Sequence, residues 1–277
     1  MAGRTTIVAF PGAHGYSLAG RIEQPIGAVR AYALFAHCFT CSKDSVATVR
    51  IARALAEKGV ATLRFDFTGL GESAGEFSET NFTSTVDDLV SAADYLRSNH
   101  QAPALLIGHS LGGAAAIAAA ERIPEVRAVA TIGAPADPGH VQHLIAPVRD
   151  RIASHGQAEL SLGGRIFLIR EQFIEDLAVQ PQKRRIRELG LPLLIMHSPQ
   201  DEVVGIENAS DIYQRARHPK SFVALDGANH MLTHQDDTAY AAGILAQWAS
   251  RYLEPTGQSV SSLPRTPTHS ITNGTIR

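Results

Sequence analysis

Short apolar runs alternate along the chain with segments whose apolar residues recur at helical spacing. In residues 81–99 the apolar positions return every three or four residues, which predicts a helix, and residues 104–108 follow as a buried strand. The alternation predicts an α/β fold with a mostly parallel sheet covered by helices on both faces. The predicted strands are 5–10, 16–22, 31–36, 60–65, 104–108, 126–133, 192–197 and 221–225. The predicted helices are 45–58, 81–99, 111–122, 206–217 and 238–253. Pro11 and Gly12 mark a turn between the first two strands, which are expected to pair antiparallel.

Two segments depart from the alternation. Residues 138–190 are too many for a simple crossover between strands, and they contain a predicted hairpin at 159–169, so we expect an inserted lid. Residues 254–277 are rich in Pro, Ser and Thr and lack apolar periodicity, which predicts a flexible tail or a linker. The folded domain is therefore expected to span residues 1–253.

Composition and charge exclude several classes of protein. The 277 residues are 44% hydrophobic and 19% charged, which is enough apolar material for a large core. A formal net charge of −2 lacks the basic excess of a nucleic-acid-binding surface. No apolar run approaches the roughly 20 residues of a membrane span, and the first residues do not resemble a signal peptide. With only two cysteines, no disulfide framework is expected, and the cytoplasm is the expected location.

The strongest chemical motif is Gly-His-Ser-Leu-Gly at residues 108–112. It matches the pattern G-x-S-x-G and lies between a predicted buried strand and an Ala-rich helix. A tight turn at that place holds a serine in a strained conformation with its hydroxyl exposed, so Ser110 is predicted to be a nucleophile. The alternative is that Ser110 only caps the helix that follows.

A nucleophilic serine needs a histidine base, and the base needs a carboxylate that fixes its tautomer. Asp201 follows the predicted strand 192–197, and His230 follows the strand 221–225, so these two residues are the expected acid and base. Glu202 is an alternative acid. A surface or packing role fits His234 better than a catalytic one.

The arrangement resembles the α/β-hydrolase superfamily over most of the chain. Within it, the stretches FAHCFTCSKD, RFDFTGLGES and HPKSFVALDGANHML resemble the hydrolase module that precedes an OsmC-like peroxidase domain in some bacterial proteins. The resemblance implies an eight-stranded sheet and serine-esterase chemistry. It also implies that residues after 253 either begin a linker to an OsmC-like partner domain or end a stand-alone relative.

The resemblance also assigns the oxyanion hole. In this superfamily the loop after the third strand commonly reads His-Gly-x, which corresponds here to His37, Cys38 and Phe39. The backbone N–H groups of Phe39 and Leu111 are therefore the expected oxyanion donors. His37, Cys38 and His109 are expected near the substrate, and Cys38 stands where the family usually has glycine.

Cys38 and Cys41 form a C-x-x-C pair between a strand and a helix, which is also the thioredoxin arrangement. A redox role is one interpretation of the pair, and small half-buried residues without chemistry are another.

The sequence as a whole predicts a serine hydrolase that cleaves apolar carboxylic esters or thioesters through an acyl-enzyme. The expected partner is a small-molecule substrate, without nucleic acid, membrane, metal or cofactor, and a homodimer is left open. Two other functions remain open, namely a redox protein that uses Cys38 and Cys41, and a binding module on a hydrolase scaffold that has lost catalysis.

Overall fold

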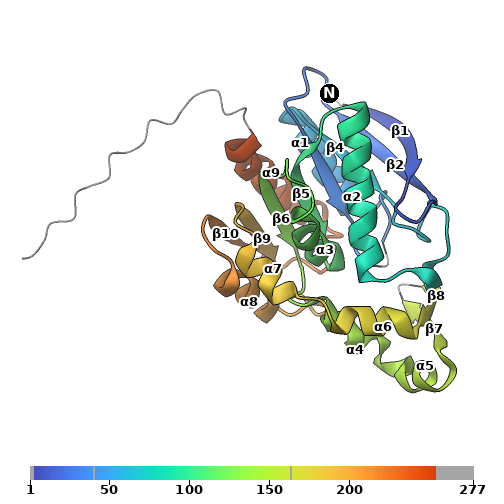
Figure 1. Cartoon of the computed structure of the whole chain (residues 1–277). Helices are drawn as coiled ribbons and strands as arrows, with labels where there is room; N and C mark the ends of the chain where they lie inside the picture. Colours follow the sequence, from blue (N-terminus) through green and yellow to red (C-terminus); the bar gives the residue numbers. More distant parts are fainter. Residues whose placement is uncertain (1–2, 40, 163, 254–277) are drawn as a thin grey trace, which may run out of the picture.

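The computed structural model describes residues 3–39, 41–162 and 164–253. The tail or linker predicted at 254–277 lies outside these described residues. Within them, eight strands form one sheet in the order β1-β2-β4-β3-β5-β6-β9-β10 (Figure 1). Its strands are β1 (Arg4–Pro11), β2 (Ser17–Gln24), β3 (Ala31–Ala36), β4 (Val60–Phe65), β5 (Pro103–His109), β6 (Ala128–Ile132), β9 (Leu193–His197) and β10 (Lys220–Ala224).

The direction of the strands agrees with the sequence-based prediction. β1 pairs antiparallel with β2, and β2 pairs antiparallel with β4. Every other neighbouring pair in the eight-stranded sheet is parallel. The predicted mostly parallel α/β-hydrolase sheet is confirmed, and all residues of β3, β4, β5, β6 and β9 are buried because helices cover both faces.

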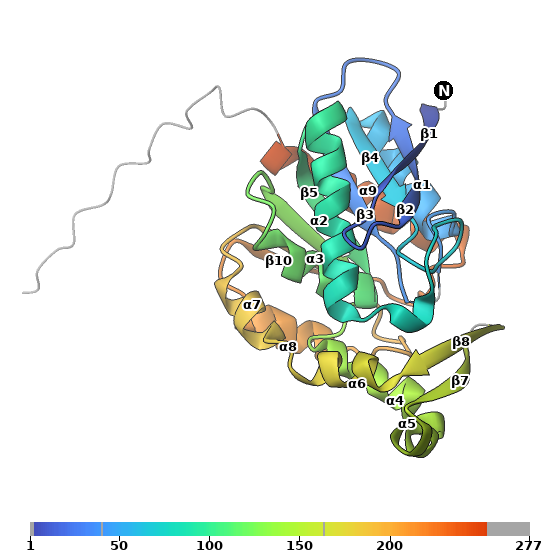
Figure 2. The same ribbon diagram turned by 45° about the vertical axis from the view of Figure 1, so that its right-hand side comes forward.

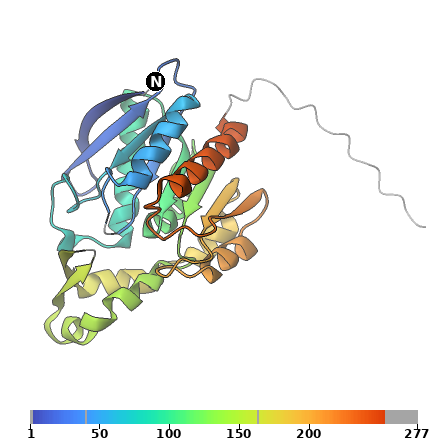
Figure 3. The ribbon, with the colours of Figure 1, turned by 180° about the vertical axis from the view of Figure 1, so that it is seen from behind.

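Two groups of helices cover the two faces. α1 (Val46–Glu57) and α9 (Gln235–Leu253) pack side by side on one face, where Figure 3 shows them in blue and red. α2 (Phe82–Asn99), α3 (Leu111–Ala120) and α8 (Glu207–Arg215) pack on the other. The predicted start of the last helix at Thr238 is corrected to Gln235, because Asp236 and Asp237 fit the first turn of a helix, where acidic side chains are favourable.

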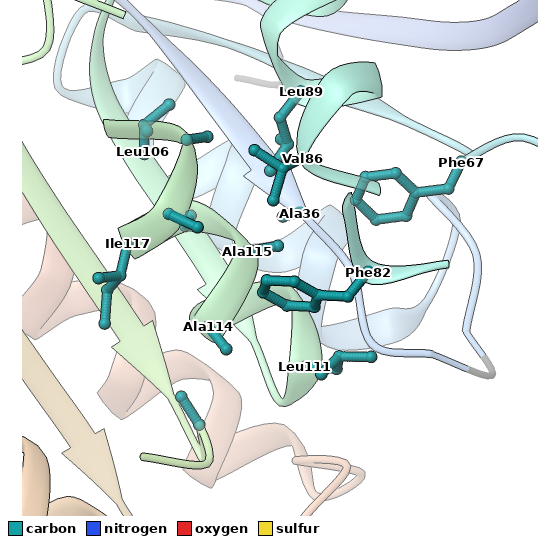
Figure 4. Packing of buried hydrophobic residues seen from close by; sticks show 14 of the residues in the cluster. Ala36, Phe67, Phe82, Val86, Leu89, Leu106, Leu111, Ala114, Ala115 and Ile117 are labelled. Carbon is teal, nitrogen blue, oxygen red and sulfur yellow. The ribbon is translucent and has the colours of Figure 1, made fainter. Parts of the chain in front are cut away.

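The core on the α2 side joins α2 and α3 to the sheet. Figure 4 shows Phe82 and Val86 of α2 packed against Leu111 and Ala115 of α3. α2 begins at a capping box, in which the Asn81 side chain accepts from the Ser84 N–H and the Asn81 N–H donates to Ser84 Oγ. This cap fixes the end of α2 that lies closest to the insertion described next.

Residues 138–190, called the insertion below, lie between β6 and β9 and pack at one end of the sheet (Figure 2). The predicted hairpin is present as an antiparallel pair. The elements are η2 (Pro138–Val141), α4 (Gln142–Ile145), η3 (Ala146–Val148), α5 (Arg149–His155), β7 (Gln157–Leu162), β8 (Arg165–Arg170), α6 (Glu171–Ala178) and α7 (Gln182–Glu188).

Side-chain hydrogen bonds hold the insertion on the sheet domain. Gln182 Nε2 donates to the carbonyl oxygen of Ala114 in α3 over 2.9 Å. Asp176 in α6 accepts hydrogen bonds from both the backbone N–H and the hydroxyl of Thr83, in the first turn of α2. Since these bonds reach the amino-terminal turns of α2 and α3, the insertion covers the carboxyl end of the parallel strands.

Phe82→Ala should destabilise the protein by about 3–5 kcal/mol, because it removes a fully buried ring from the contact between α2 and α3. The matched control is Phe222→Ala, in which a ring that is 43% exposed is removed from the edge strand β10. Urea unfolding followed by circular dichroism measures both changes. Equal losses for the two variants would contradict the packing described here.

Candidate active site

The chain turns sharply between β5 and α3 at Ser110. Its φ of 55° and ψ of −129° are a strained conformation for a residue with a side chain. The Ser110 N–H donates to the Ile132 carbonyl over 2.8 Å, which ties the turn to the end of β6. The Ser110 side chain makes no cap hydrogen bond to α3, so the interpretation of this serine as a helix cap is wrong.

The two glycines of the motif allow this turn to form. A Cβ atom on Gly108 would lie 2.2 Å from the Gly112 carbonyl oxygen. A Cβ atom on Gly112 would lie 2.4 Å from the carbonyl oxygen of Ala36 and 2.5 Å from that of His37. Glycine at these two positions therefore brings the first turn of α3 against the loop that follows β3.

Asp201 and His230 meet across the loops after β9 and β10. His230 Nδ1 donates to Asp201 Oδ2 over 2.7 Å, and Asp201 Oδ1 accepts the backbone N–H groups of Val203 and Val204 at 2.9 Å. Burial alone would raise the pKa of the Asp201 carboxyl. The hydrogen bonds from His230 and Val204 outweigh that effect and hold this pKa below its ordinary value, so Asp201 is ionised at neutral pH.

The alternative acid and base lie elsewhere. Glu202 and His234 are both exposed. Asp201, by contrast, is only 8% exposed and is bonded to His230. The structure thus brings together the pair that the sequence analysis chose.

The Asp201–His230 pair lies beside the serine turn. Gly133 directly follows the residue that accepts the Ser110 N–H, and a Cβ atom on Gly133 would lie 3.2 Å from Asp201 Oδ2 and 3.3 Å from His230 Nδ1. His109, next to the serine, donates from Nε2 to the His230 carbonyl oxygen over 2.8 Å. Within the described residues, no hydrogen bond joins the Ser110 hydroxyl to His230.

The loop after β3 forms a turn at Cys38. The Cys41 N–H donates to the Cys38 carbonyl over 3.1 Å, and the two sulfur atoms form a disulfide. The sequence predicted no disulfide framework and left the role of this C-x-x-C pair open; in the structure the two cysteines are joined. Leu111, the other expected oxyanion donor, is the first residue of α3, where its N–H has no intrahelical acceptor.

A buried ion pair, not predicted from the sequence, fixes the loop after β3 to the loop after β4. Asp66, after β4, accepts the backbone N–H and the ammonium group of Lys43, both at 2.7 Å, and also the N–H of Glu72 at 2.9 Å. Burial would lower the pKa of the Lys43 ammonium, but its hydrogen bonds to Asp66 and Glu72 raise this pKa above its ordinary value. Gly71 closes the loop around the carboxylate, because a Cβ atom there would lie 2.2 Å from Asp66 Oδ2.

Aromatic side chains line a small cavity beside Leu111. Its volume is about 20 Å³, and Phe39, Phe77, Phe173 and His37 are in its wall. The ring of Phe39 lies 5.2 Å from that of Phe77 and 5.3 Å from that of Phe173, measured between ring centroids. The cavity therefore joins the loop after β3 to the insertion. Of the three residues expected near the substrate, His37 lines this cavity, whereas Cys38 and His109 do not.

Candidate metal ligands gather in one place. Among the described residues, Cys38, Cys41 and His109 are the only group of three or more His, Cys, Asp or Glu side chains whose ligand atoms lie close enough to share an ion. The histidine pair His140 and His143 has no third such side chain within reach in the part of the chain that the structure describes. Every helix in the described residues is too short or too polar to cross a bilayer.

The chain is similar to several known proteins. The family model described as "Serine aminopeptidase, S33" matches residues 28–181. The crystal structure of the esterase domain from a Rhodothermus marinus protein is 48% identical, has a TM-score of 0.75, and covers 90% of this chain and 99% of that one. Alpha/beta hydrolase domain-containing protein 10 from mouse shares the fold, with 19% identity, a TM-score of 0.72, and coverage of 89% of this chain and 99% of that one.

Curated relatives match over part of their length. The mitochondrial palmitoyl-protein thioesterase ABHD10 of Mus musculus is 25% identical over 198 residues, which are 69% of this chain and 66% of that protein. The uncharacterized protein YfhR of Salmonella typhimurium is 27% identical over 184 residues, which are 64% of this chain and 57% of that protein. The matched part is about half the length of the relatives YfhR and human ABHD12B. Because the family model covers more than half of the chain, and because the sheet and its helices agree with the solved relatives, the chain belongs to the S33 serine aminopeptidase family of the α/β-hydrolase superfamily.

Proposed function

We propose that the chain hydrolyses carboxylic esters or thioesters, with Ser110 as nucleophile, His230 as base and Asp201 as the acid that orients the base. The observation that carries this proposal is the 2.7 Å hydrogen bond between His230 and Asp201, beside a serine with a positive φ. A carboxylate that binds Nδ1–H leaves Nε2 of the imidazole to accept a proton. The hydrogen bond from the base to the serine is often loose without substrate and tightens when substrate binds.

The reaction proceeds through an acyl-enzyme. Ser110 Oγ attacks the acyl carbonyl while His230 takes its proton, and His230 then gives this proton to the departing alcohol or thiol. The N–H groups of Phe39 and Leu111 bind the oxyanion, and such donors each contribute roughly 10²–10³ in rate. A water molecule activated by His230 then releases the acid.

The comparisons favour esters and thioesters as the substrate class. The solved relative with 48% identity is named an esterase domain, and ABHD10 is named a palmitoyl-protein thioesterase. The apolar, aromatic wall of the cavity suits contact with an acyl group of small to medium size, and a cavity of about 20 Å³ must open further to admit one. Residues 1–253 are proposed to form one hydrolase domain, in which the insertion is a lid that shapes the acyl pocket. A linker to an OsmC-like domain after residue 253 stays a prediction.

His109 is suited to a place beside the base because it stays neutral. Burial, the larger cause, and the nearby His230 together lower the pKa of His109 to about 4. At neutral pH no positive charge at His109 therefore opposes the imidazolium that forms at His230 during the reaction.

Ser110→Ala should lower kcat by about 10⁴-fold or more and abolish labelling by a fluorophosphonate probe. Asp201→Asn should lower kcat by about 10⁴-fold, because the base would lose the carboxylate that fixes its tautomer. Hydrolysis of p-nitrophenyl butyrate and mass-spectrometric mapping of the probe measure these effects. Glu202→Gln is the control and should keep normal activity; a large loss there, together with an active Asp201→Asn, would move the acid to Glu202.

Phe173→Ala should widen the acyl pocket and shift the preference from short toward longer chains. The ratio of kcat/KM for p-nitrophenyl hexanoate to that for the acetate is expected to rise about tenfold, which is the scale of a few methylene groups in an apolar pocket. Phe222→Ala removes an exposed ring outside this wall and should leave the ratio unchanged. An unchanged ratio in Phe173→Ala would place the acyl group elsewhere.

His109→Gln should flatten the dependence of the free energy of unfolding on pH between about 4 and 6.5. In this range the unfolded chain binds a proton at His109 that the folded chain does not, so the stability of the wild type rises with pH. Removal of the imidazole should reduce the slope by about one proton. Urea unfolding at a series of pH values measures the slope, with the exposed His234→Gln as control. A slope that is unchanged in His109→Gln would show that His109 is protonated in the folded chain.

A further inference from the structure

A cluster of two sulfur atoms and one imidazole lies between the loop after β3 and the end of β5. Cys38, Cys41 and His109 each offer a ligand atom within 4.8 Å of the others, and all three residues are at least 92% buried. The proposed reaction does not use either sulfur. The cluster therefore needs an explanation of its own.

The ligands are of the kinds that bind zinc. Two cysteines separated by two residues are a common chelating pair, and thiolate and imidazole groups together favour zinc over hard cations such as magnesium. The cluster also has an outer hydrogen bond of the usual kind. His109 donates its Nε2–H to the His230 carbonyl oxygen, which leaves Nδ1 with a free lone pair. A metal-bound histidine usually donates a hydrogen bond from the N–H of its other ring nitrogen to a carbonyl or carboxylate in this way.

We propose that Cys38, Cys41 and His109 bind one zinc ion when the disulfide is reduced. The two sulfur atoms can form either the disulfide or the metal site, but not both at once. A metal binds the thiolate form of cysteine, and a disulfide contains no thiolate. Reduction by a trialkylphosphine converts phosphine, disulfide and water into phosphine oxide and two thiols. Metal binding then forms two sulfur–metal bonds and releases two protons. Three protein ligands leave a fourth position for water or an added ligand.

The position of the cluster links it to the active site. Cys38 and Cys41 flank the loop that carries the proposed oxyanion donor Phe39, and His109 is bonded to the backbone of His230. The rings of His109 and His230 lie 5.0 Å apart. A bound ion therefore fixes the position of the loop and of His109. If the proposed function is correct, zinc bound at this site should change the rate of ester hydrolysis. The binding of zinc to the cluster does not depend on the proposed function.

Cobalt(II) tests the site directly because it binds zinc ligands and is coloured. The full chain is reduced with a trialkylphosphine, freed of it by anaerobic gel filtration, and titrated with Co²⁺. One equivalent should produce a sulfur-to-cobalt charge-transfer band and the visible bands of a tetrahedral site, and Zn²⁺ should remove both. The oxidised protein should show neither, since its sulfur atoms are bonded to each other.

Two variants separate the ligands from a general effect on folding. Cys41→Ser should lose the charge-transfer band at one equivalent. His109→Gln keeps both cysteines and should bind Co²⁺ roughly tenfold or more weakly, whereas the exposed His234→Gln should bind normally. Circular dichroism checks that each variant is folded. Absence of the band in the reduced wild type, or an undiminished band in Cys41→Ser, would overturn the proposal. Fluorophosphonate labelling of the metal-free protein tests the proposed hydrolase separately.

Discussion

The buried pair of Lys43 and Asp66 is the interaction on which the candidate site depends. It joins the loop after β3, which carries the proposed oxyanion donor Phe39, to the loop after β4. Both side chains are almost inaccessible to water, and removal of one partner from such a pair typically costs about 3–5 kcal/mol. Three donors surround the Asp66 carboxylate, so its charge is compensated where water cannot reach it. The position of Phe39 thus rests on electrostatics below the loop as well as on the sheet.

The features that were predicted from the sequence are those with a local cause. The strands appeared as short apolar runs, and the motif at residues 108–112 was recognisable because a turn of this kind needs small residues at fixed spacing. Asp201 and His230 were predicted from the chain order serine, acid, base and from their places after two late strands. They meet in the structure because parallel strands end at the same edge of a sheet.

The features that were missed depend on contacts between distant parts of the chain. Lys43 and Asp66 are 23 residues apart, and no periodic pattern links them. The aromatic wall combines Phe39 with Phe173 of the insertion, whose path over the sheet cannot be read from its composition. Cys38 and Cys41 were seen as a pair, but whether the sulfur atoms approach each other depends on the turn between them, which the sequence pattern leaves open.

The bond between Thr83 and Asp176 has a consequence for motion. Thr83 lies in the first turn of α2, where backbone N–H groups have no partner within the helix, and a carboxylate from α6 of the insertion serves as the acceptor. A negative charge at the amino-terminal end of a helix also interacts favourably with the positive end of the helix dipole. If the insertion moves as the proposed lid, it takes this carboxylate with it and leaves the Thr83 N–H to water, so opening would loosen the first turn of α2 while the Asn81 cap stays in place.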